Sequence, residues 1–287
     1  MPGMVQMSRR VADRDVMPIG FGAMRLGMEG RPSADQAVRT LHAAFDAGVQ
    51  LIDTAVNYCI GPDEYGYDEA LVSRALSEWS GDSSQVAVVC KGGVRRSATE
   101  SVLIDSSPAN LRWSCETSLR ALGADQIWLY LLHAVDPAVP FEESVGTLVE
   151  LQREGKVANI GLSNIGRKQL EIAQGLMTVA SVQNGLSLWN RSSLPLARMC
   201  AEDGIAFHAY APLGAGGKDL SHPVLVEVAA RHERSAAQVA LAWVLAQTTT
   251  TVPIPGGRQV KSVRDSAAAA QVTLTEQDLN DLEAILD

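Results

Sequence analysis

The sequence predicts a single (β/α)8 barrel, an α/β fold of the TIM-barrel class, in one domain over residues 1–287. Short apolar, β-branched runs alternate with longer segments of helical periodicity, which is typical of βα units and a parallel sheet. Eight such pairs fit into the 287 residues, a length that such barrels commonly occupy as one domain. No low-complexity linker interrupts the repeat, which leaves little room for a doubly wound sheet with a separate lid.

Eight strands are expected at the short apolar runs 17–24, 50–55, 86–92, 127–133, 157–163, 181–188, 205–213 and 250–256. Eight helices are expected at the segments of helical periodicity, 33–47, 66–79, 108–122, 141–154, 167–175, 193–203, 235–247 and 275–286. Four segments do not fit this repeat, and we expect specificity to lie in them: 5–16, the polar loop 93–107, the glycine-rich loop 213–222 and a helical insertion near 259–268.

Residues at the expected helix boundaries support this division. Ser33, Ser107 and Ser235 each stand immediately before a helical segment, where a serine side chain accepts hydrogen bonds from the free backbone N–H groups. Gly48 and Gly123 follow helical segments and precede strands, as glycines that end a helix in the left-handed conformation do. The boundaries therefore recur with the period that the barrel needs.

The composition argues against several classes of function. The formal net charge is −9, so we expect no nucleic-acid partner, because neutralising phosphates requires a clustered basic surface. No run approaches the roughly 20 apolar residues that span a bilayer, and the first residues contain no apolar signal core. We expect a cytoplasmic protein with no membrane partner, and a monomer or a weak homo-oligomer.

Cysteine and histidine usage predicts neither disulfides nor a metal. The four cysteines lack the paired spacing of a zinc site and the density of a disulfide scaffold, so we expect free thiols at Cys59, Cys90, Cys115 and Cys200. A metal-dependent barrel hydrolase could use Asp53 and His133 as ligands. It would need further ligands at the strand ends, and His208 is the one obvious addition.

Four polar residues follow successive expected strands and carry a coherent chemistry. Asp53, Lys91 and His133 end the second, third and fourth strands, and Tyr58 lies five residues beyond Asp53. The carboxyl ends of barrel strands are where catalytic groups gather. An ammonium near a phenol makes its proton easier to give, a carboxylate keeps the ammonium charged, and an imidazole can donate to a carbonyl oxygen. The set predicts an acid for carbonyl reduction.

Each of these residues also has an ordinary interpretation when taken alone. An aspartate at a strand end is often a helix cap, and a lysine after a strand is usually a solvated charge at the rim. A histidine after an apolar strand is more often structural than catalytic. The prediction therefore depends on the four residues occurring together and in this order.

Several ordered motifs resemble the aldo-keto reductase superfamily. DTAVNY at 53–58 is similar to the DTAxxY motif of its second strand, and SLRALGADQIWLYLLHAVDP at 118–137 is similar to the helix and strand that end in its histidine. GKVANIGLSN at 155–164 and PIPGGR at 253–258 match the fifth and eighth strands. The resemblance covers nearly the whole chain and implies an NAD(P)H-dependent oxidoreductase that reduces an aldehyde or ketone.

The resemblance also implies a catalytic tetrad, at Asp53, Tyr58, Lys91 and His133. The loop after Tyr58 contains Tyr65 and Tyr67, which are alternative candidates for the acid. The five-residue spacing from Asp53 favours Tyr58.

The expected cofactor is NADPH, with NADH use left open. Gly20 and Gly22 form half of a dinucleotide fingerprint, but its third glycine is absent, which argues against a Rossmann site. The family instead implies a cofactor extended across the rim. The nicotinamide carboxamide is expected against Ser163, Asn164 and Gln183, with its ring stacked on Tyr210. The pyrophosphate is expected at the loop with Leu213, Gly214, Gly216 and Lys218, for which a flexible turn is the alternative. Further expected cofactor contacts are Gly22, Ala23, Met24, Asp53, Ala211 and Pro212. Ordinary hydrogen bonding for Asn164 and Gln183, and core packing for Tyr210, are the alternatives.

The adenosine end is expected at Ile254, Gly256, Gly257, Arg258, Ser262, Asp265 and Ser266, by the same resemblance. Arg258 is the candidate for the 2′-phosphate, since a guanidinium favours that group over a bare ribose. Asp265 and Ser266 stand where relatives usually carry Glu and Asn, which weakens the expected adenine clamp. Lys261 or Arg264 could compensate.

The substrate is expected to be a small-molecule carbonyl in an open pocket, because the loops beyond His133 and the last helix are short. The expected lining is Arg25, Asn57, Tyr58, His133 and Trp189, although Trp189 could be a packing residue instead. Two alternatives remain: an alcohol dehydrogenase that works in the oxidative direction, and a cofactor-binding, redox-sensing or regulatory subunit of the same family type.

Overall fold

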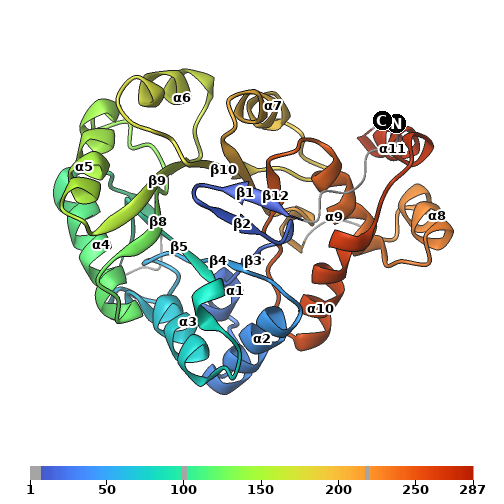
Figure 1. Cartoon of the computed structure of the whole chain (residues 1–287), viewed down its shortest axis with the longest axis horizontal. Helices are drawn as coiled ribbons and strands as arrows, with labels where there is room; N and C mark the ends of the chain where they lie inside the picture. Colours follow the sequence, from blue (N-terminus) through green and yellow to red (C-terminus); the bar gives the residue numbers. More distant parts are fainter. Residues whose placement is uncertain (1–7, 98–101, 217–219, 287) are drawn as a thin grey trace.

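The computed structural model describes residues 8–97, 102–216 and 220–286. Eight parallel strands lie side by side in one sheet, in the order β12-β11-β10-β9-β8-β5-β4-β3. The two edges of the sheet meet through a parallel bridge between Gly22 and Gly256, so the sheet is a nearly closed barrel. Figure 1 shows the strands at the centre with helices around them. The predicted (β/α)8 class is confirmed.

The barrel strands are short. They are β3 (Phe21–Gly22), β4 (Leu51–Asp53), β5 (Ala87–Gly92), β8 (Ile127–Leu132), β9 (Val157–Ser163), β10 (Ser181–Gly185), β11 (Ala206–Tyr210) and β12 (Thr251–Pro253). The expected first strand, 17–24, is thus reduced to two residues. The Gly20 and Gly22 N–H groups donate to the carbonyls of Pro253 and Pro255 at 3.0 and 3.1 Å. Because Pro253 and Pro255 have no N–H, neither can donate a hydrogen bond back to the first strand.

The helices follow the expected repeat closely. Those packed around the barrel are α2 (Ala34–Asp46), α3 (Tyr67–Glu78), α4 (Pro108–Leu122), α5 (Phe141–Arg153), α6 (Arg167–Gln174), α7 (Leu194–Glu202) and α9 (Ala236–Ala246), followed by α11 (Glu276–Glu283). Ser33, Ser107 and Ser235 accept hydrogen bonds from N–H groups three residues on. Gly48 and Gly123 have φ values of 86° and 64°. The predicted caps and helix ends are therefore confirmed.

The segments outside the repeat add several elements. The insertion near 259–268 is helix α10 (Val260–Ala268), as expected, and α1 (Met24–Gly27) is a single turn at the rim. Helix α8 (Pro223–Arg231) was not expected. His222 precedes it and makes no side-chain cap, and Pro223 in its first turn was the available signal for its start.

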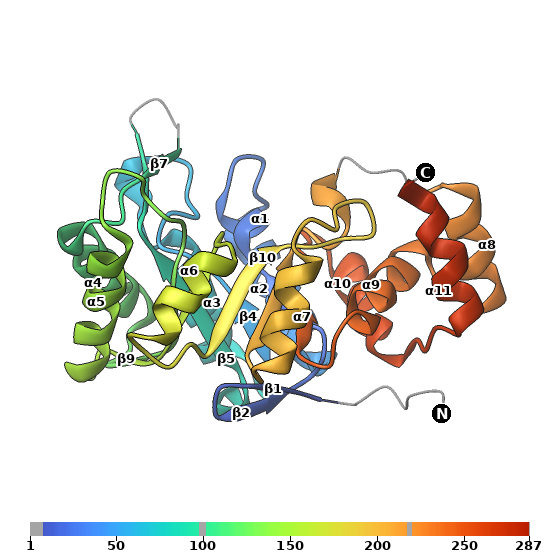
Figure 2. The same cartoon turned by 90° about the horizontal axis from the view of Figure 1, so that it is seen from above.

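Two antiparallel hairpins lie at opposite ends of the barrel (Figure 2). β1 (Arg9–Val11) and β2 (Arg14–Val16) close one end, where Val11 and Val16 join the core inside the barrel with Leu51 and Leu129. β6 (Val94–Arg96) and β7 (Val102–Ile104) follow β5 at the other end. Since barrel sites gather beyond the carboxyl ends of the strands, the site is expected on the β6–β7 side.

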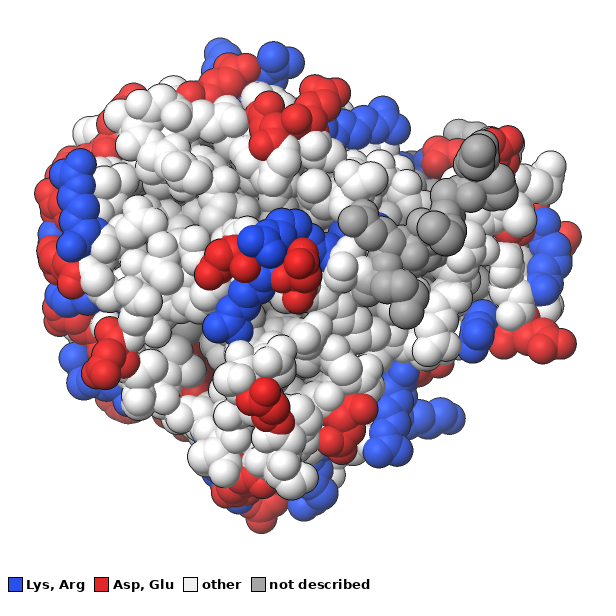
Figure 3. All heavy atoms as spheres, in the orientation of Figure 1, with Lys and Arg blue, Asp and Glu red and all other residues white. Residues whose placement is uncertain are grey.

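The charges on the β1–β2 face are mixed. Figure 3 shows lysine and arginine interspersed with aspartate and glutamate on this face.

The four cysteines are free and buried. Within 8–97, 102–216 and 220–286, no helix is long and apolar enough to cross a membrane. The same residues contain no group of three or more histidine, cysteine or acidic side chains placed to hold a metal ion.

Candidate active site

A fully buried lysine lies at the centre of the site. Lys91, near the end of β5, donates one hydrogen bond to Asp53 Oδ2 at 2.7 Å, one to the Thr54 carbonyl at 2.9 Å and one to the Tyr58 hydroxyl at 3.0 Å. Its side chain has no exposed surface. The three protons of the ammonium group are therefore all directed to acceptors, which fixes its position.

Asp53 balances this charge from the neighbouring strand. Its second carboxylate oxygen, Oδ1, accepts a hydrogen bond of 2.6 Å from Gln183 Nε2, across the barrel on β10. Burial would lower the pKa of Lys91, but the charge of Asp53 and the nearby Tyr58 outweigh it and raise that pKa above its ordinary value. Lys91 is consequently a permanent cation beside the phenol.

Tyr58 lies in the loop between β4 and α3. Burial raises the pKa of Tyr58 to about 12, against the opposing influence of Lys91. The phenol is therefore protonated at neutral pH, which suits an acid that has still to give its proton. A side chain on Gly27 of α1 would place a Cβ only 2.2 Å from the Tyr58 carbonyl oxygen. Glycine at this position lets α1 approach the loop that carries Tyr58.

His133 stands directly after β8 and faces Tyr58. The two rings meet edge to face, with centroids 5.7 Å apart and planes at 82°. Burial, with a smaller contribution from Lys91, lowers the pKa of His133 well below its usual range. Its Nδ1 is buried and has no hydrogen-bond partner within the described residues. A neutral imidazole can donate or accept a hydrogen bond, so His133 adds an uncharged polar group beside Tyr58.

The alternative tyrosines lie elsewhere. The Tyr65 hydroxyl accepts from the Arg96 N–H at 2.6 Å and donates to its carbonyl at 3.0 Å. The guanidinium of Arg31 lies 3.8 Å from the centre of the Tyr67 ring. Of the three candidates, the geometry therefore brings Tyr58 to the lysine.

The expected nicotinamide contacts lie together at the rim. Asn164 donates to the His133 carbonyl at 2.9 Å and to Ser163 Oγ at 3.1 Å, and its Oδ1 accepts from the Tyr210 hydroxyl at 2.7 Å. A Cβ on Gly185 would lie 3.2 Å from the Tyr210 ring, so glycine allows the ring to lie close to the strand end. An aromatic face beside amide groups fits a planar ring that carries a carboxamide.

Other expected cofactor residues also make backbone contacts that hold the barrel together. Ala23 donates from its N–H to the Asp53 carbonyl at 2.9 Å. A Cβ on Gly22 would lie 3.0 Å from the Ile254 carbonyl oxygen, and one on Gly256 3.0 Å from that of Gly22. These glycines close the barrel, whether or not they also contact a cofactor. Met24 is 43% exposed at the rim.

The glycine-rich loop is joined to the opposite side of the rim. Arg25 donates from Nη2 to the Ala215 carbonyl at 2.9 Å. Ala211, Gly214 and Ala215 have φ values of 49°, 72° and 58°, and such left-handed turns expose backbone N–H groups. Pro212 is buried, Leu213 packs on the core, and Gly216 ends a short 3-10 turn. The expected pyrophosphate contact Lys218 lies outside the described residues.

The expected adenosine site is only partly free for a ligand. Arg258 donates from Nη2 to the Glu29 carbonyl at 3.0 Å and from Nε to the Arg25 carbonyl at 3.4 Å. Asp265 accepts from Ser235 Oγ at 2.8 Å and from Gln238 Nε2 at 3.1 Å. Its carboxylate is therefore occupied at the start of α9. The sequence expectation did not include these contacts.

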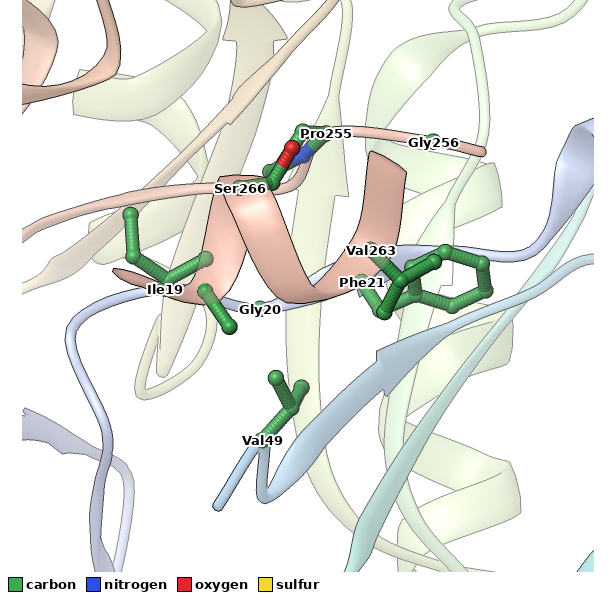
Figure 4. Close-up of a pocket in the computed structure, with 9 residues that line it drawn as sticks. Ile19, Gly20, Phe21, Val49, Pro255, Gly256, Val263 and Ser266 are labelled. Atoms are coloured by element: carbon green, nitrogen blue, oxygen red, sulfur yellow. The ribbon is translucent and has the colours of Figure 1, made fainter. Parts of the chain in front are cut away.

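The remaining residues of this end lie on or near α10. Ser262, Lys261 and Arg264 are exposed. Ser266 lines a small cavity of about 10 Å³ with Ile19, Gly20, Val49 and Pro255 (Figure 4). A cavity of this size holds about one water molecule and no adenine. The cofactor roles of Ser262, Asp265, Ser266, Gly257 and Arg258 stay predictions.

The expected substrate residues differ in exposure. Asn57 is 4% exposed, and its carbonyl accepts from Arg96 Nε at 3.2 Å. Asn57 therefore ties the Tyr58 loop to the β6–β7 hairpin. Trp189 is partly exposed and packs against the main core. Tyr58 and His133 are the residues of this set that face each other.

Sequence reasoning did not single out two buried acids near the site, and it considered a third buried group, His208, only as a metal ligand. Asp68 and Glu69, in the first turn of α3, and His208, on β11, have no exposed surface. Thr54 Oγ1 donates to Asp68 Oδ2 at 2.8 Å. Neither ring nitrogen of His208 has a partner in the described part of the chain. Asp68 and Glu69 lie ten and eleven residues beyond DTAVNY, at the start of an expected helix. Acidic residues at a helix start are commonly exposed to solvent, so the sequence does not mark these two as buried.

A (β/α)8 barrel with buried polar side chains at its carboxyl rim is a fold shared by many enzymes, so the class of this protein comes from comparison with known proteins. The model of the aldo/keto reductase family matches residues 18–287. The chain belongs to the aldo-keto reductase family.

Individual relatives agree with this assignment. The chain is 33% identical to the soybean (Glycine max) protein named probable aldo-keto reductase 1, over 93% of this chain and 85% of that one. It is 33% identical to pyridoxine 4-dehydrogenase of Escherichia coli, over 95% and 96% of the two chains. A solved aldo-keto reductase from Klebsiella pneumoniae in complex with NADPH has a TM-score of 0.83 at 27% identity, covering 99% of this chain and 96% of that one.

Proposed function

We propose that the protein is an NADPH-dependent reductase that converts an aldehyde or ketone to an alcohol, with Tyr58 as the general acid. The observation that supports this most directly is the contact of 3.0 Å between the Tyr58 hydroxyl and the buried Lys91 ammonium. The NADPH complex of the Klebsiella relative supports the choice of cofactor. Bound NADPH would supply a hydride to the carbonyl carbon.

The chain's own residues would handle the proton and the developing charge. Tyr58 would donate its proton to the carbonyl oxygen as the alkoxide forms, and Lys91 would stabilise the phenolate that remains. Asp53 keeps Lys91 charged and in place. His133, which is neutral, would orient the carbonyl oxygen by a hydrogen bond. Ser163, Asn164 and Gln183 would hold the carboxamide, with the ring against Tyr210.

Dehydrogenation of an alcohol by the same groups is the reverse reaction and stays the second candidate. The name of the Escherichia coli relative, pyridoxine 4-dehydrogenase, favours including it. In that direction the Tyr58 phenolate would accept the hydroxyl proton.

The remaining alternative is a redox-sensing or regulatory subunit, which would bind the cofactor without turning over a substrate.

The test is turnover by the purified protein with NADPH or NADH and a panel of aldehydes and ketones that includes pyridoxal, followed by the absorbance of the reduced nicotinamide. Tyr58→Phe should lower kcat by at least about 100-fold, the contribution typical of a general acid. Tyr65→Phe is the matched control and should stay within about threefold of wild type, the change expected away from the reacting groups. Full turnover in Tyr58→Phe would contradict the assignment.

A further inference from the structure

Two acidic side chains that the proposed reaction does not use lie buried beside Tyr58. Asp68 and Glu69 occupy the first turn of α3, and neither has any exposed surface. Asp68 Oδ2 accepts the hydrogen bond of 2.8 Å from Thr54 Oγ1, and Asp68 Oδ1 is buried without a partner among the described residues. A carboxylate removed from water with one oxygen unpaired is costly to ionise.

Thr54 connects Asp68 to the reacting groups. Its hydroxyl donates to Asp68, and its carbonyl accepts the proton of Lys91 at 2.9 Å. Lys91 in turn contacts the Tyr58 hydroxyl at 3.0 Å. The path from Asp68 to Tyr58 therefore runs through two buried residues: Thr54, whose hydroxyl contacts Asp68 and whose backbone carbonyl contacts Lys91, and Lys91 itself, which contacts Tyr58.

The charges around Asp68 do not balance if every acid is ionised. The charged groups that act on it are Lys91 from β5, Asp53 from β4 and Glu69 from its own helix. From α1 its neighbour is Gly27, whose added Cβ would lie 3.0 Å from the Asp68 Cβ. Asp53 already forms the ion pair with the single ammonium. Asp68 is thus left without a cation of its own, which favours its neutral, protonated form.

We propose that Asp68 is a positioning residue that tunes the acidity of Tyr58: as a neutral carboxyl it leaves the phenol proton easy to release, and as a carboxylate it holds that proton more tightly through Thr54 and Lys91. The inference rests on the proposed function, because it assumes that Tyr58 exchanges the proton of the reaction. It assigns a pH response to a residue outside the tetrad.

The direction of this response follows from the electrostatics. Burial raises the pKa of Asp68 to about 8, partly opposed by the hydrogen bond from Thr54. Asp68 in its ionised form adds to the rise in the pKa of Tyr58 that burial causes. The coupling is reciprocal, so removing the charge of Asp68 lets Tyr58 lose its proton at lower pH.

The test uses Asp68→Asn, which keeps the shape and the acceptor for Thr54 but cannot ionise. Oxidation of 4-nitrobenzyl alcohol with NADP⁺ requires the Tyr58 phenolate, so its kcat/KM should rise with pH. The midpoint of this rise should lie about 0.5 to 1 pH unit lower in Asp68→Asn than in wild type, the size of a neighbouring-charge effect. Glu69→Gln removes an equal buried charge from the same turn and should move the midpoint less than half as far.

An unchanged midpoint in Asp68→Asn, or an equal shift in Glu69→Gln, would overturn the proposal. If Asp68→Asn does not fold by circular dichroism, Thr54→Val removes only the hydrogen bond and should shift the midpoint in the same direction, and a midpoint equal to wild type would contradict the proposal. If wild type shows no turnover, the proposed function fails on its own. In that case a pH titration of tyrosinate absorbance replaces the kinetics. The absorbance step that is present in wild type and absent in Tyr58→Phe reports the ionisation of Tyr58, and Asp68→Asn should shift that step to lower pH.

Discussion

Lys91 Nζ lies 3.0 Å from the Tyr58 hydroxyl oxygen and 2.7 Å from Asp53 Oδ2, and no part of the lysine side chain reaches solvent. The phenol and the carboxylate therefore share one buried cation. Under the proposed function, these two contacts make stability and catalysis separable: Asp53 would need the cation for charge balance, and Tyr58 would need it as an electrostatic partner for the phenolate.

The first prediction concerns this separation. Lys91→Met should lower kcat by at least about 100-fold and should lower the free energy of unfolding by about 3 to 5 kcal/mol, because it leaves Asp53 buried and unpaired. In the double variant Lys91→Met/Asp53→Asn, most of the stability should return while kcat stays low. Urea unfolding and steady-state kinetics measure the two quantities. Recovery of kcat together with stability would contradict the electrostatic role of Lys91.

Most of the fold could be predicted from the sequence, because its signals are local and repeat eight times. The caps at Ser33, Ser107 and Ser235 and the left-handed Gly48 and Gly123 are chemical requirements of helix ends. The first strand shortens because its partners across the seam include Pro253 and Pro255, a pairing between the two ends of the chain. Helix α8 was missed although Pro223 in its first turn marks a helix start, because the residue before it, His222, makes no side-chain cap.

The site was predictable in part. The tetrad residues follow consecutive strands, so the topology alone brings them to one end of the barrel. The bonds of Arg258 to the Glu29 carbonyl and of Asp265 to Ser235 join segments distant in the chain, and no sequence pattern marks them. The burial of Asp68 and His208 was equally hidden, because it depends on how closely α1 and the barrel interior pack around them.

The second prediction concerns the approach of α1 to the Tyr58 loop. Gly27→Ala places a Cβ 2.2 Å from the Tyr58 carbonyl oxygen, so either α1 or the loop must move. The free energy of unfolding should fall by about 1 to 3 kcal/mol, and kcat should fall with it. Gly146→Ala is the matched control, because that glycine lies within α5 and an added Cβ meets nothing within 4 Å.

Gly146→Ala should leave kcat unchanged and raise the free energy of unfolding by about 0.5 to 1 kcal/mol, through the better helix propensity of alanine. Urea unfolding of the two variants, with turnover measured on the same samples, makes the comparison. Wild-type stability and turnover in Gly27→Ala would show that the close approach of α1 is not required.

The third prediction concerns His208 and acid stability. Burial, with a smaller contribution from Lys91, lowers the pKa of His208 to about 3. The unfolded chain has a histidine pKa of about 6.5, so this residue's contribution to stability is complete above that value and is lost as the pH falls toward about 3. His208→Leu should therefore flatten the decline of Tm with falling pH.

At about pH 5, the free energy of unfolding should favour His208→Leu by about 2 kcal/mol, relative to the two proteins' difference at neutral pH. The neutral-pH difference serves as the control, because it contains only the change in packing. Some decline should remain in the variant, since burial also lowers the pKa of His133. Parallel Tm curves for wild type and variant across the acid range would show that His208 takes up no proton on unfolding.

The last prediction separates two roles for Arg258. Its guanidinium donates to the carbonyls of Glu29 and Arg25, so Arg258→Ala removes both a positive charge and a tie to the segment after α1. If Arg258 binds the 2′-phosphate, fluorescence titration should show at least about a tenfold loss of NADPH affinity and little change for NADH, because the hydrogen bonds to that charged group are lost. Arg258→Lys should retain part of the NADPH affinity, since the ammonium keeps the charge but not the planar fork. Equal losses for both cofactors would assign Arg258 to positioning the rim, and an unchanged NADPH affinity would remove it from the phosphate site.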